Sequence, residues 1–113
     1  MSGITTHVLD TTLGRPASGV PLTLECQTAE GWSVLGTGAT DQDGRCRTLL
    51  GPEPKVEPGV YRLTFDTGTY FDAIGQEGFY PSVTVVFTIR NAEQHYHVPL
   101  LLSLFGYSTY RGS

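Results

Sequence analysis

An alternation of apolar and polar residues with a period of two constrains this chain more than any other feature. Successive side chains of an extended strand point to opposite faces, so alternation over about four to eight residues predicts a strand with one buried face. Turn residues interrupt the runs at short intervals. The pattern predicts strands over residues 4–10, 20–26, 32–40, 45–50, 59–66, 82–90, 94–102 and 105–110. Many short strands favour two sheets packed face to face.

One segment, residues 66–75, departs from this period. It opens with Asp66 and Thr67, residue types that commonly cap helices, and it closes on Gly75. We expect a short helix of about two turns there. The 14 glycines and 7 prolines among 113 residues argue against a helical bundle, because both are poor helix formers. The prediction is therefore an all-β sandwich with one short helix, folded as a single domain over residues 1–113.

Charge and hydropathy argue against several classes of partner. The formal net charge is -4 and the pI is near 5.1, so no basic surface for nucleic acid or an anionic membrane is expected. No run approaches the roughly 18 apolar residues of a membrane span. Neither a secretory signal nor a peroxisomal address is visible, which favours a cytoplasmic location. We expect Cys26 and Cys46 to be free buried thiols, with a disulfide between them left open.

The predicted strand 94–102 is apolar on both faces. Its even-numbered residues from 98 onward are valine or leucine and form the obvious core face. His97 lies on the opposite face with His95, Pro99 and Leu101. This second face is too apolar for open solvent, so we expect a partner subunit to cover it.

A further histidine, His7, lies in the middle of the first predicted strand. Imidazole titrates near neutral pH, which makes His7 and His97 candidates for a general acid or base. A structural histidine is the alternative for each ring, and His95, beside a turn, fits that alternative. The His95-x-His97 spacing also permits a metal site with His7 as third ligand, although no carboxylate or cysteine pattern joins them.

Arg45 follows the predicted turn over residues 41–44 and begins a strand. Its guanidinium can donate two parallel hydrogen bonds to a planar, anionic, carbonyl-rich ligand. An ordinary surface arginine is the alternative, and Arg47 on the same face is a weaker candidate. No nucleophile elbow, phosphate-binding loop or zinc-protease motif occurs. Pattern alone therefore yields a β-sandwich with two histidines of interest and no assigned activity.

Several motifs together resemble the transthyretin-like 5-hydroxyisourate hydrolases. They are Thr-Thr-His-Val-Leu-Asp-Thr at 5–11, the Asp-Gly-Arg turn within 40–45, Gly-Val-Tyr at 59–61, Phe-Tyr-Pro at 79–81, and the close over 97–113, which ends in Tyr-Arg-Gly-Ser. The resemblance is colinear and covers essentially the whole chain. The terminal Tyr-Arg-Gly-Ser is its most specific element, because it distinguishes the hydrolases from thyroid-hormone carriers of the same fold. Those carriers also lack the two histidines and the arginine.

The resemblance implies a transthyretin-like sandwich of two four-stranded sheets with one short helix. It further implies a homotetramer, a dimer of dimers, with active sites at the dimer–dimer interface. The matching positions are His7, Arg45 and His97 for the catalytic residues and Tyr110, Arg111, Gly112 and Ser113 for substrate binding. The terminal Ser113 would reach the substrate site.

The implied reaction is the hydrolysis of 5-hydroxyisourate to 2-oxo-4-hydroxy-4-carboxy-5-ureidoimidazoline in urate (purine) degradation, without a metal or organic cofactor. The alternatives are a non-enzymatic carrier of a small ligand and an interaction module that pairs through an edge strand. One departure from the family pattern is visible. Leu104 follows Ser103 where the family usually has proline, which leaves the rigidity of the bend before the last strand in question.

Overall fold

The computed structural model describes residues 3–47, 49 and 56–113. Within them the chain forms strands β1 Gly3–Asp10, β2 Arg15–Pro16, β3 Pro21–Thr28, β4 Gly31–Ala39, β5 Arg45–Cys46, β6 Gly59–Phe65, β7 Val83–Ile89, β8 His95–Leu102 and β9 Tyr107–Thr109, and the helix α1 Thr67–Ala73. Of the predicted strand over 45–50, Arg45–Cys46 form β5, whereas Arg47 and Leu49 lie outside any strand. Positions 48 and 50 lie outside the described part of the chain.

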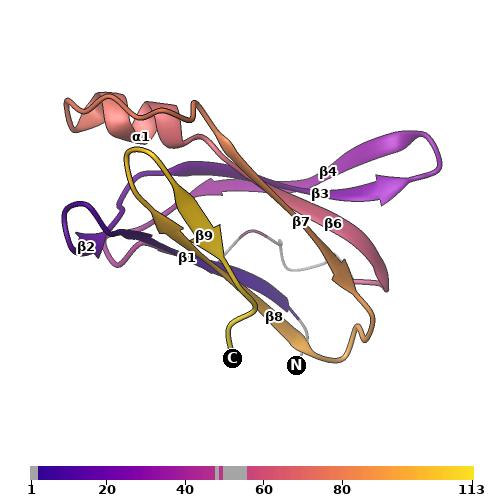
Figure 1. Ribbon diagram of the computed structural model, residues 1–113. Helices are drawn as coiled ribbons and strands as arrows, with labels where there is room; N and C mark the ends of the chain where they lie inside the picture. The colour runs from indigo at the N-terminus through magenta and orange to yellow at the C-terminus, as the bar shows by residue number, and fades with distance from the viewer. Residues whose placement is uncertain (1–2, 48, 50–55) are drawn as a thin grey trace.

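The strands form two sheets that pack face to face, which confirms the predicted all-β sandwich (Figure 1). One sheet has the order β2-β1-β8-β9 with β5 also paired to β1, and we call it the β1–β8 sheet. The other, the β3–β6 sheet, has the order β4-β3-β6-β7. The β1–β8 sheet therefore has five strands rather than the four implied by the family resemblance. The difference is that the short strands β2 and β5 lie one after the other along the same edge of β1.

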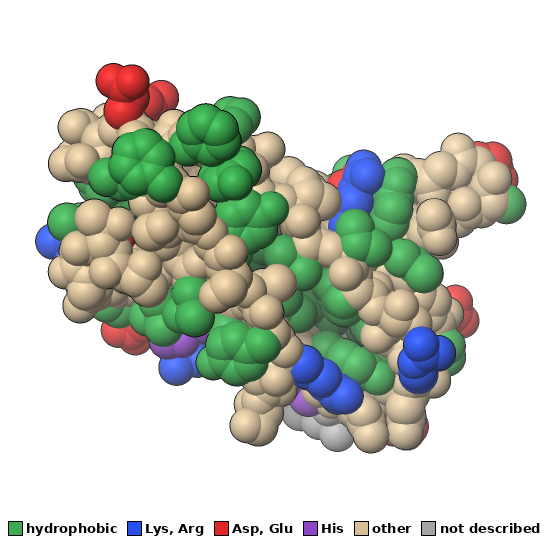
Figure 2. All heavy atoms as spheres, in the orientation of Figure 1, with side chains coloured by type: hydrophobic (Ala, Val, Ile, Leu, Met, Phe, Trp, Pro, Cys, Tyr) green, Lys and Arg blue, Asp and Glu red, His purple; other side chains and the backbone are tan. Residues whose placement is uncertain are grey.

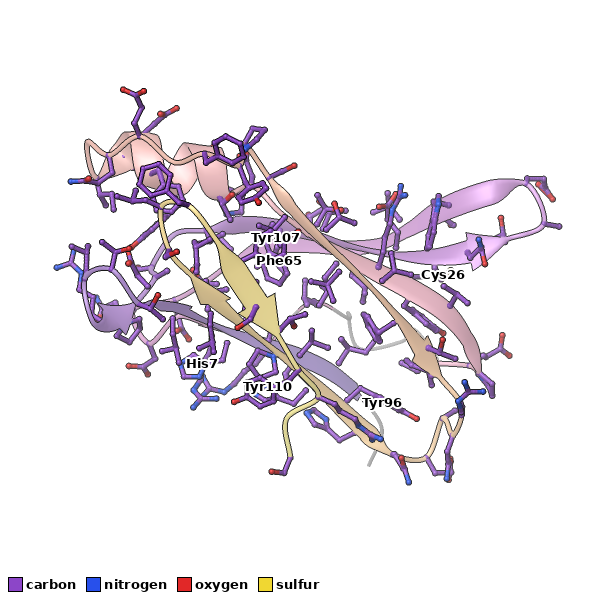
Figure 3. All side chains as sticks on the ribbon, viewed as in Figure 1. His7, Cys26, Phe65, Tyr96, Tyr107 and Tyr110 are labelled. Carbon is purple, nitrogen blue, oxygen red and sulfur yellow. The ribbon has the colours of Figure 1, made fainter. Side chains whose placement is uncertain are left out.

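Burial follows the predicted alternation on both sheets. In β1 every second residue from Ile4 to Asp10 is buried, and in β6 Tyr61, Leu63 and Phe65 are buried. Figure 3 shows Phe65 between the sheets and His7 on the far side of β1. The alternation thus sends His7, Thr5 and the other odd-numbered residues of β1 to the outer face of the β1–β8 sheet.

The helix begins where the sequence predicts. The Asp66 carboxylate accepts a hydrogen bond from the backbone N–H of Thr69 at 3.1 Å, which caps the first turn. Gly75, just beyond the C-terminal end of the helix, has φ +70°, a conformation that residues other than glycine rarely adopt. The buried hydroxyl of Tyr70 donates to Asp10 Oδ2 at 2.6 Å. This bond connects the helix to the end of β1. Burial, and after it the hydrogen bond to the Asp10 carboxylate, raise the pKa of Tyr70 to about 12.

The bend between β8 and β9 is held without a proline. Ser103 N–H and its hydroxyl both donate to the carbonyl of Gly106, at 2.9 and 3.0 Å. The carbonyl of Leu104 accepts from Phe79 N–H at 2.7 Å, and its side chain packs on the core. Leucine at 104 thus supplies packing contacts in the bend where the family usually has proline.

The prediction of two free thiols is confirmed, but Cys26 is half-buried rather than buried, whereas Cys46 is buried. Among the described residues, no helix has the length and apolar character that crossing a bilayer by a helix requires.

Candidate active site

The pairing of β1 with its two neighbours brings three candidate residues onto one surface. His7 is paired with Arg45 of β5 on one side and with Pro99 of β8 on the other. Thr5, two residues earlier on β1, is paired with His97. Paired residues of adjacent strands point to the same face, so His7, Arg45 and His97 all lie on the outer face of the β1–β8 sheet. The parallel β1–β8 pairing joins the two ends of the chain to build this surface.

His7 is oriented by the turn before β5. Its Nε2 lies 2.8 Å from the backbone carbonyl of Asp43. A carbonyl can only accept, so Nε2 carries the proton. In the neutral ring the other nitrogen, Nδ1, therefore has a free lone pair. His7 is consequently held in one tautomer with a nitrogen able to accept a proton.

His97 is held by the hydroxyl of Thr5, whose Oγ1 lies 2.8 Å from His97 Nδ1. The same oxygen lies 2.9 Å from Nε2 of His95. Burial is the main cause that lowers the pKa of His97 below its usual value, followed by the positive charges of Arg45, His7 and His95. The His97 ring is therefore predominantly neutral at pH 7 and available as a base.

Arg45 is placed by a turn built on Asp41. The Asp41 carboxylate accepts from the backbone N–H groups of Asp43 and Arg45, at 2.9 and 3.0 Å. These bonds, the Arg45 N–H first, hold the pKa of Asp41 below its usual value. Gly44 has φ +76°, and a Cβ there would meet the Val8 carbonyl at 2.3 Å, so the turn requires glycine. Within the described part of the chain, the Arg45 guanidinium makes no ion pair or hydrogen bond.

A cleft of about 320 Å³ opens over this surface. It is lined by Thr5, Thr6, Arg45, Arg47, His95, His97 and Ser113. A volume of this size is at the lower end for a small-molecule site. The cleft brings a guanidinium, imidazoles and hydroxyls together, with His7 close enough for its charge to act on His97.

The C-terminal tail completes one wall of the cleft. Gly112 N–H donates to the carbonyl of His97 at 2.8 Å. A Cβ on Gly112 would lie 2.6 Å from Cδ2 of His97 and 3.2 Å from Cγ of Pro99. Glycine at this position therefore lets the tail lie directly against the imidazole and brings Ser113 to the cleft.

Tyr110 and Arg111 lie in an adjoining hollow. This hollow, of about 520 Å³, lies between β7, β8 and β9 and is mainly apolar; Figure 2 shows hydrophobic side chains at its walls and basic ones at its rim. The Arg111 guanidinium lies 4.4 Å over the ring of Tyr96 and donates to Gln94 Oε1 at 3.0 Å. The structure thus brings Ser113 together with Arg45 and His97, while Arg111 anchors the tail. His97 lines both spaces.

The sequence analysis did not identify Thr5, and it treated His95 as a structural histidine beside a turn. His95 is exposed, but its ring nitrogen shares the Thr5 hydroxyl with His97. The spacing of two between His95 and His97 showed that both rings lie on one face of β8. Only the register of β1 against β8 shows that Thr5 lies between them. The three-histidine metal site has no support in this geometry, since no three His, Cys, Asp or Glu side chains of the described residues are arranged to hold an ion.

Comparison with known families identifies the relatives of this chain. Residues 4–112 match the model of the HIUase/Transthyretin family. The chain belongs to this family. The 5-hydroxyisourate hydrolase of Mus musculus is 53% identical over 99% of this chain and 96% of its own length. That of Salmonella dublin is 50% identical over 97% of this chain and 80% of its own length.

Solved structures of the family share the fold. The 5-hydroxyisourate hydrolase of Klebsiella pneumoniae superposes with a TM-score of 0.86 at 34% identity, covering 100% of both chains. Sea bream transthyretin in complex with thyroxine superposes with a TM-score of 0.89 at 35% identity, covering 96% of this chain and 93% of its own. The fold therefore accommodates both a hydrolase and a thyroxine-binding protein, and the side chains of the site must separate the two.

Proposed function

We propose that this chain hydrolyses 5-hydroxyisourate in urate degradation, acting as a single domain over residues 1–113. The observation that carries the proposal is the shared outer face of His7, Arg45 and His97, with a guanidinium that forms no ion pair among the described residues. Relatives that share about half of the residues over nearly the full chain carry the name of this enzyme. A carrier of the same fold has no need of two imidazoles and a free guanidinium on one face.

The proposed chemistry uses side chains and water only. A neutral imidazole of the His7–His97 pair takes a proton from water while the water oxygen attacks a ring carbonyl of the substrate. The lactam C–N bond then breaks, the ring nitrogen takes the proton from the imidazolium, and a carboxyl group is left on the product.

Arg45 and the tail have separate roles in this scheme. The guanidinium of Arg45 holds the anionic edge of the substrate and stabilises the oxyanion that forms on the attacked carbonyl. Ser113, through its hydroxyl, orients substrate or water in the cleft. Arg111 and Gly112 contribute by holding the tail against β8, and Tyr110 lines the adjoining hollow.

The proposed assembly is a homotetramer, a dimer of dimers, with sites at the dimer–dimer interface. Support comes from the edge strands β7 and β9, which end the two sheets on the same side of the sandwich. Val86 on β7 is 57% exposed and Tyr107 on β9 is 43% exposed. Apolar edge strands of this kind pair with another chain. A sedimentation measurement giving a monomer at micromolar concentration would contradict the assembly.

The proposed compartment is the cytoplasm.

The activity is tested by mixing the purified protein with freshly generated 5-hydroxyisourate and following its ultraviolet decay. We expect decay much faster than the spontaneous rate and proportional to protein concentration. The His7→Ala, His97→Ala double variant is the matched control, and its decay should approach the spontaneous rate. Decay of the wild-type reaction at the spontaneous rate, with thyroxine-like ligands bound instead, would favour the carrier.

A further inference from the structure

The hydroxyl of Thr5 links two imidazoles that both belong to β8. Its Oγ1 is 2.8 Å from His97 Nδ1 and 2.9 Å from His95 Nε2. A hydroxyl has one proton to donate and two lone pairs. It cannot donate to both rings, so at least one of the two bonded nitrogens must carry a proton. The proton positions on the two rings are therefore coupled through the Thr5 hydroxyl.

The surroundings of His97 favour one position for the proton of its neutral ring. Nε2 of His97 makes no hydrogen bond within the described residues and is not shut away from solvent. The positive charge of Arg45, which lines the same cleft, acts on this ring. In a cleft that holds a positive charge, a nitrogen lone pair is more favourable than an N–H. The stable neutral form of His97 thus has its proton on Nδ1, where Thr5 accepts it.

We propose that Thr5 is a positioning residue, which accepts the Nδ1 proton of His97, donates its own proton to Nε2 of His95, and so presents the bare Nε2 of His97 to the cleft. The inference rests on the proposed function, because only a base needs that lone pair. His95 acts on His97 indirectly, through Thr5. Because it accepts the Thr5 proton, it keeps the hydroxyl from donating to His97.

The arrangement mirrors the one around His7. There a backbone carbonyl, that of Asp43, fixes the proton on Nε2 and leaves Nδ1 free. A carbonyl cannot reverse its role, whereas the Thr5 hydroxyl can. The Thr5 arrangement consequently depends on His95, and this dependence can be measured.

The first experiment reads the tautomer directly. Long-range ¹H–¹⁵N correlation spectra of histidine-labelled protein at pH 8 should show His97 with a protonated Nδ1 and a bare Nε2, and His95 with a bare Nε2. The opposite pattern at His97 overturns the proposal, whether or not the protein is active. Wild-type protein without hydrolase activity but with the expected pattern would instead refute the proposed function and leave the hydrogen bonds standing.

The second experiment removes the hydroxyl. Thr5→Val keeps the shape and the β-branched backbone preference of threonine, and Thr5→Ser keeps the hydroxyl. We expect Thr5→Val to lower kcat about tenfold, the size of one lost hydrogen bond, with KM little changed and with signals of both His97 tautomers. Thr5→Ser should restore both readouts. Equal kcat and an unchanged ¹⁵N pattern in folded Thr5→Val protein would overturn the proposal.

The third experiment asks whether His95 acts through Thr5. His95→Ala frees the hydroxyl to donate to His97 and should shift the His97 signals toward the tautomer protonated on Nε2. Combined with Thr5→Val it should cause no further loss of kcat, because the hydroxyl is already gone. Additive losses in the double variant would show that His95 acts on its own and would overturn this part of the proposal.

Discussion

Two arginines on the outer faces of the two sheets have opposite surroundings. Arg62 of the β3–β6 sheet donates to both carboxylate oxygens of Glu25, at 2.6 and 3.2 Å, and lies 4.2 Å over the ring of Trp32. These contacts raise the pKa of Arg62 and lower that of Glu25, the mutual hydrogen bond being the main cause. Arg45 of the β1–β8 sheet has no such partner among the described residues.

The difference separates a structural cation from an available one. A guanidinium that is already bidentate with a carboxylate has its donors in use and offers little to a ligand. Arg45 is held through its backbone, by Asp41 and by pairing with β1, so the donors of its guanidinium remain available for a ligand. The neighbours sharpen the contrast, because Arg45 shares its face with His7 and His97.

The largest expected effect comes from the imidazoles beside Arg45. His7→Ala and His97→Ala should each lower kcat by about 10²–10⁴-fold, the usual range for general-base assistance, without loss of the folded assembly. Steady-state kinetics and sedimentation check the two parts. Near-normal turnover in either variant would remove that ring from the chemistry and break the contrast between the two faces.

The arginines themselves provide a matched pair. Arg45→Met should lower kcat by about 10²–10³-fold, because a donor to the developing oxyanion is lost, and should leave the melting temperature nearly unchanged. Arg62→Met should do the reverse, with normal kcat and a slightly lower melting temperature. Similar kinetics of the two variants would show that freedom from an acidic partner does not mark the functional arginine.

The tail is tested by its glycine. Gly112→Ala places a methyl group 2.6 Å from Cδ2 of His97, so the ring or the tail must move. A misplacement of this order costs about 10²-fold in kcat/KM when catalytic geometry depends on it. Gly106→Ala, where a Cβ meets only Ser103 Oγ at 3.8 Å, is the control in the same segment. Equal kcat/KM in the two variants would exclude the tail from the site.

The smallest expected effect is on the titration of His97. Its lowered pKa keeps the ring neutral as the pH falls past 6.5, the ordinary value, so kcat/KM should decline only below that pH. Burial is the main cause and Arg45 the next, so in Arg45→Met the pKa of His97 should rise toward 6.5. His7 and His95 are the further causes that lower this pKa, and Arg47 lines the same cleft.

NMR titration of the ring measures this pKa directly, even where activity is lost. Arg62→Met, on the other sheet, should leave the midpoint unchanged. A midpoint in Arg45→Met equal to that of the wild type would show that the charge of Arg45 does not reach His97.

Much of the fold was predictable from local pattern. The alternation in β6 predicted that Tyr61, Leu63 and Phe65 share the buried face, and the structure confirms it. Asp66 and Gly75 marked the ends of the helix correctly, because caps act within a single turn. The short strand β2 was missed, since two residues carry no periodicity and its pairing with the end of β1 is not local.

The sequence by itself determined which side chains point outward, because a strand alternates its faces wherever it is placed. It therefore put His7 and His97 on outer faces, and the family resemblance added Arg45 and the terminal Tyr-Arg-Gly-Ser. Only the tertiary structure decided which outward groups meet. The register of β1 against β8 joins residues about ninety positions apart, so the Thr5 hydroxyl between His95 and His97 follows from pairing energies spread over both strands, which no local pattern records.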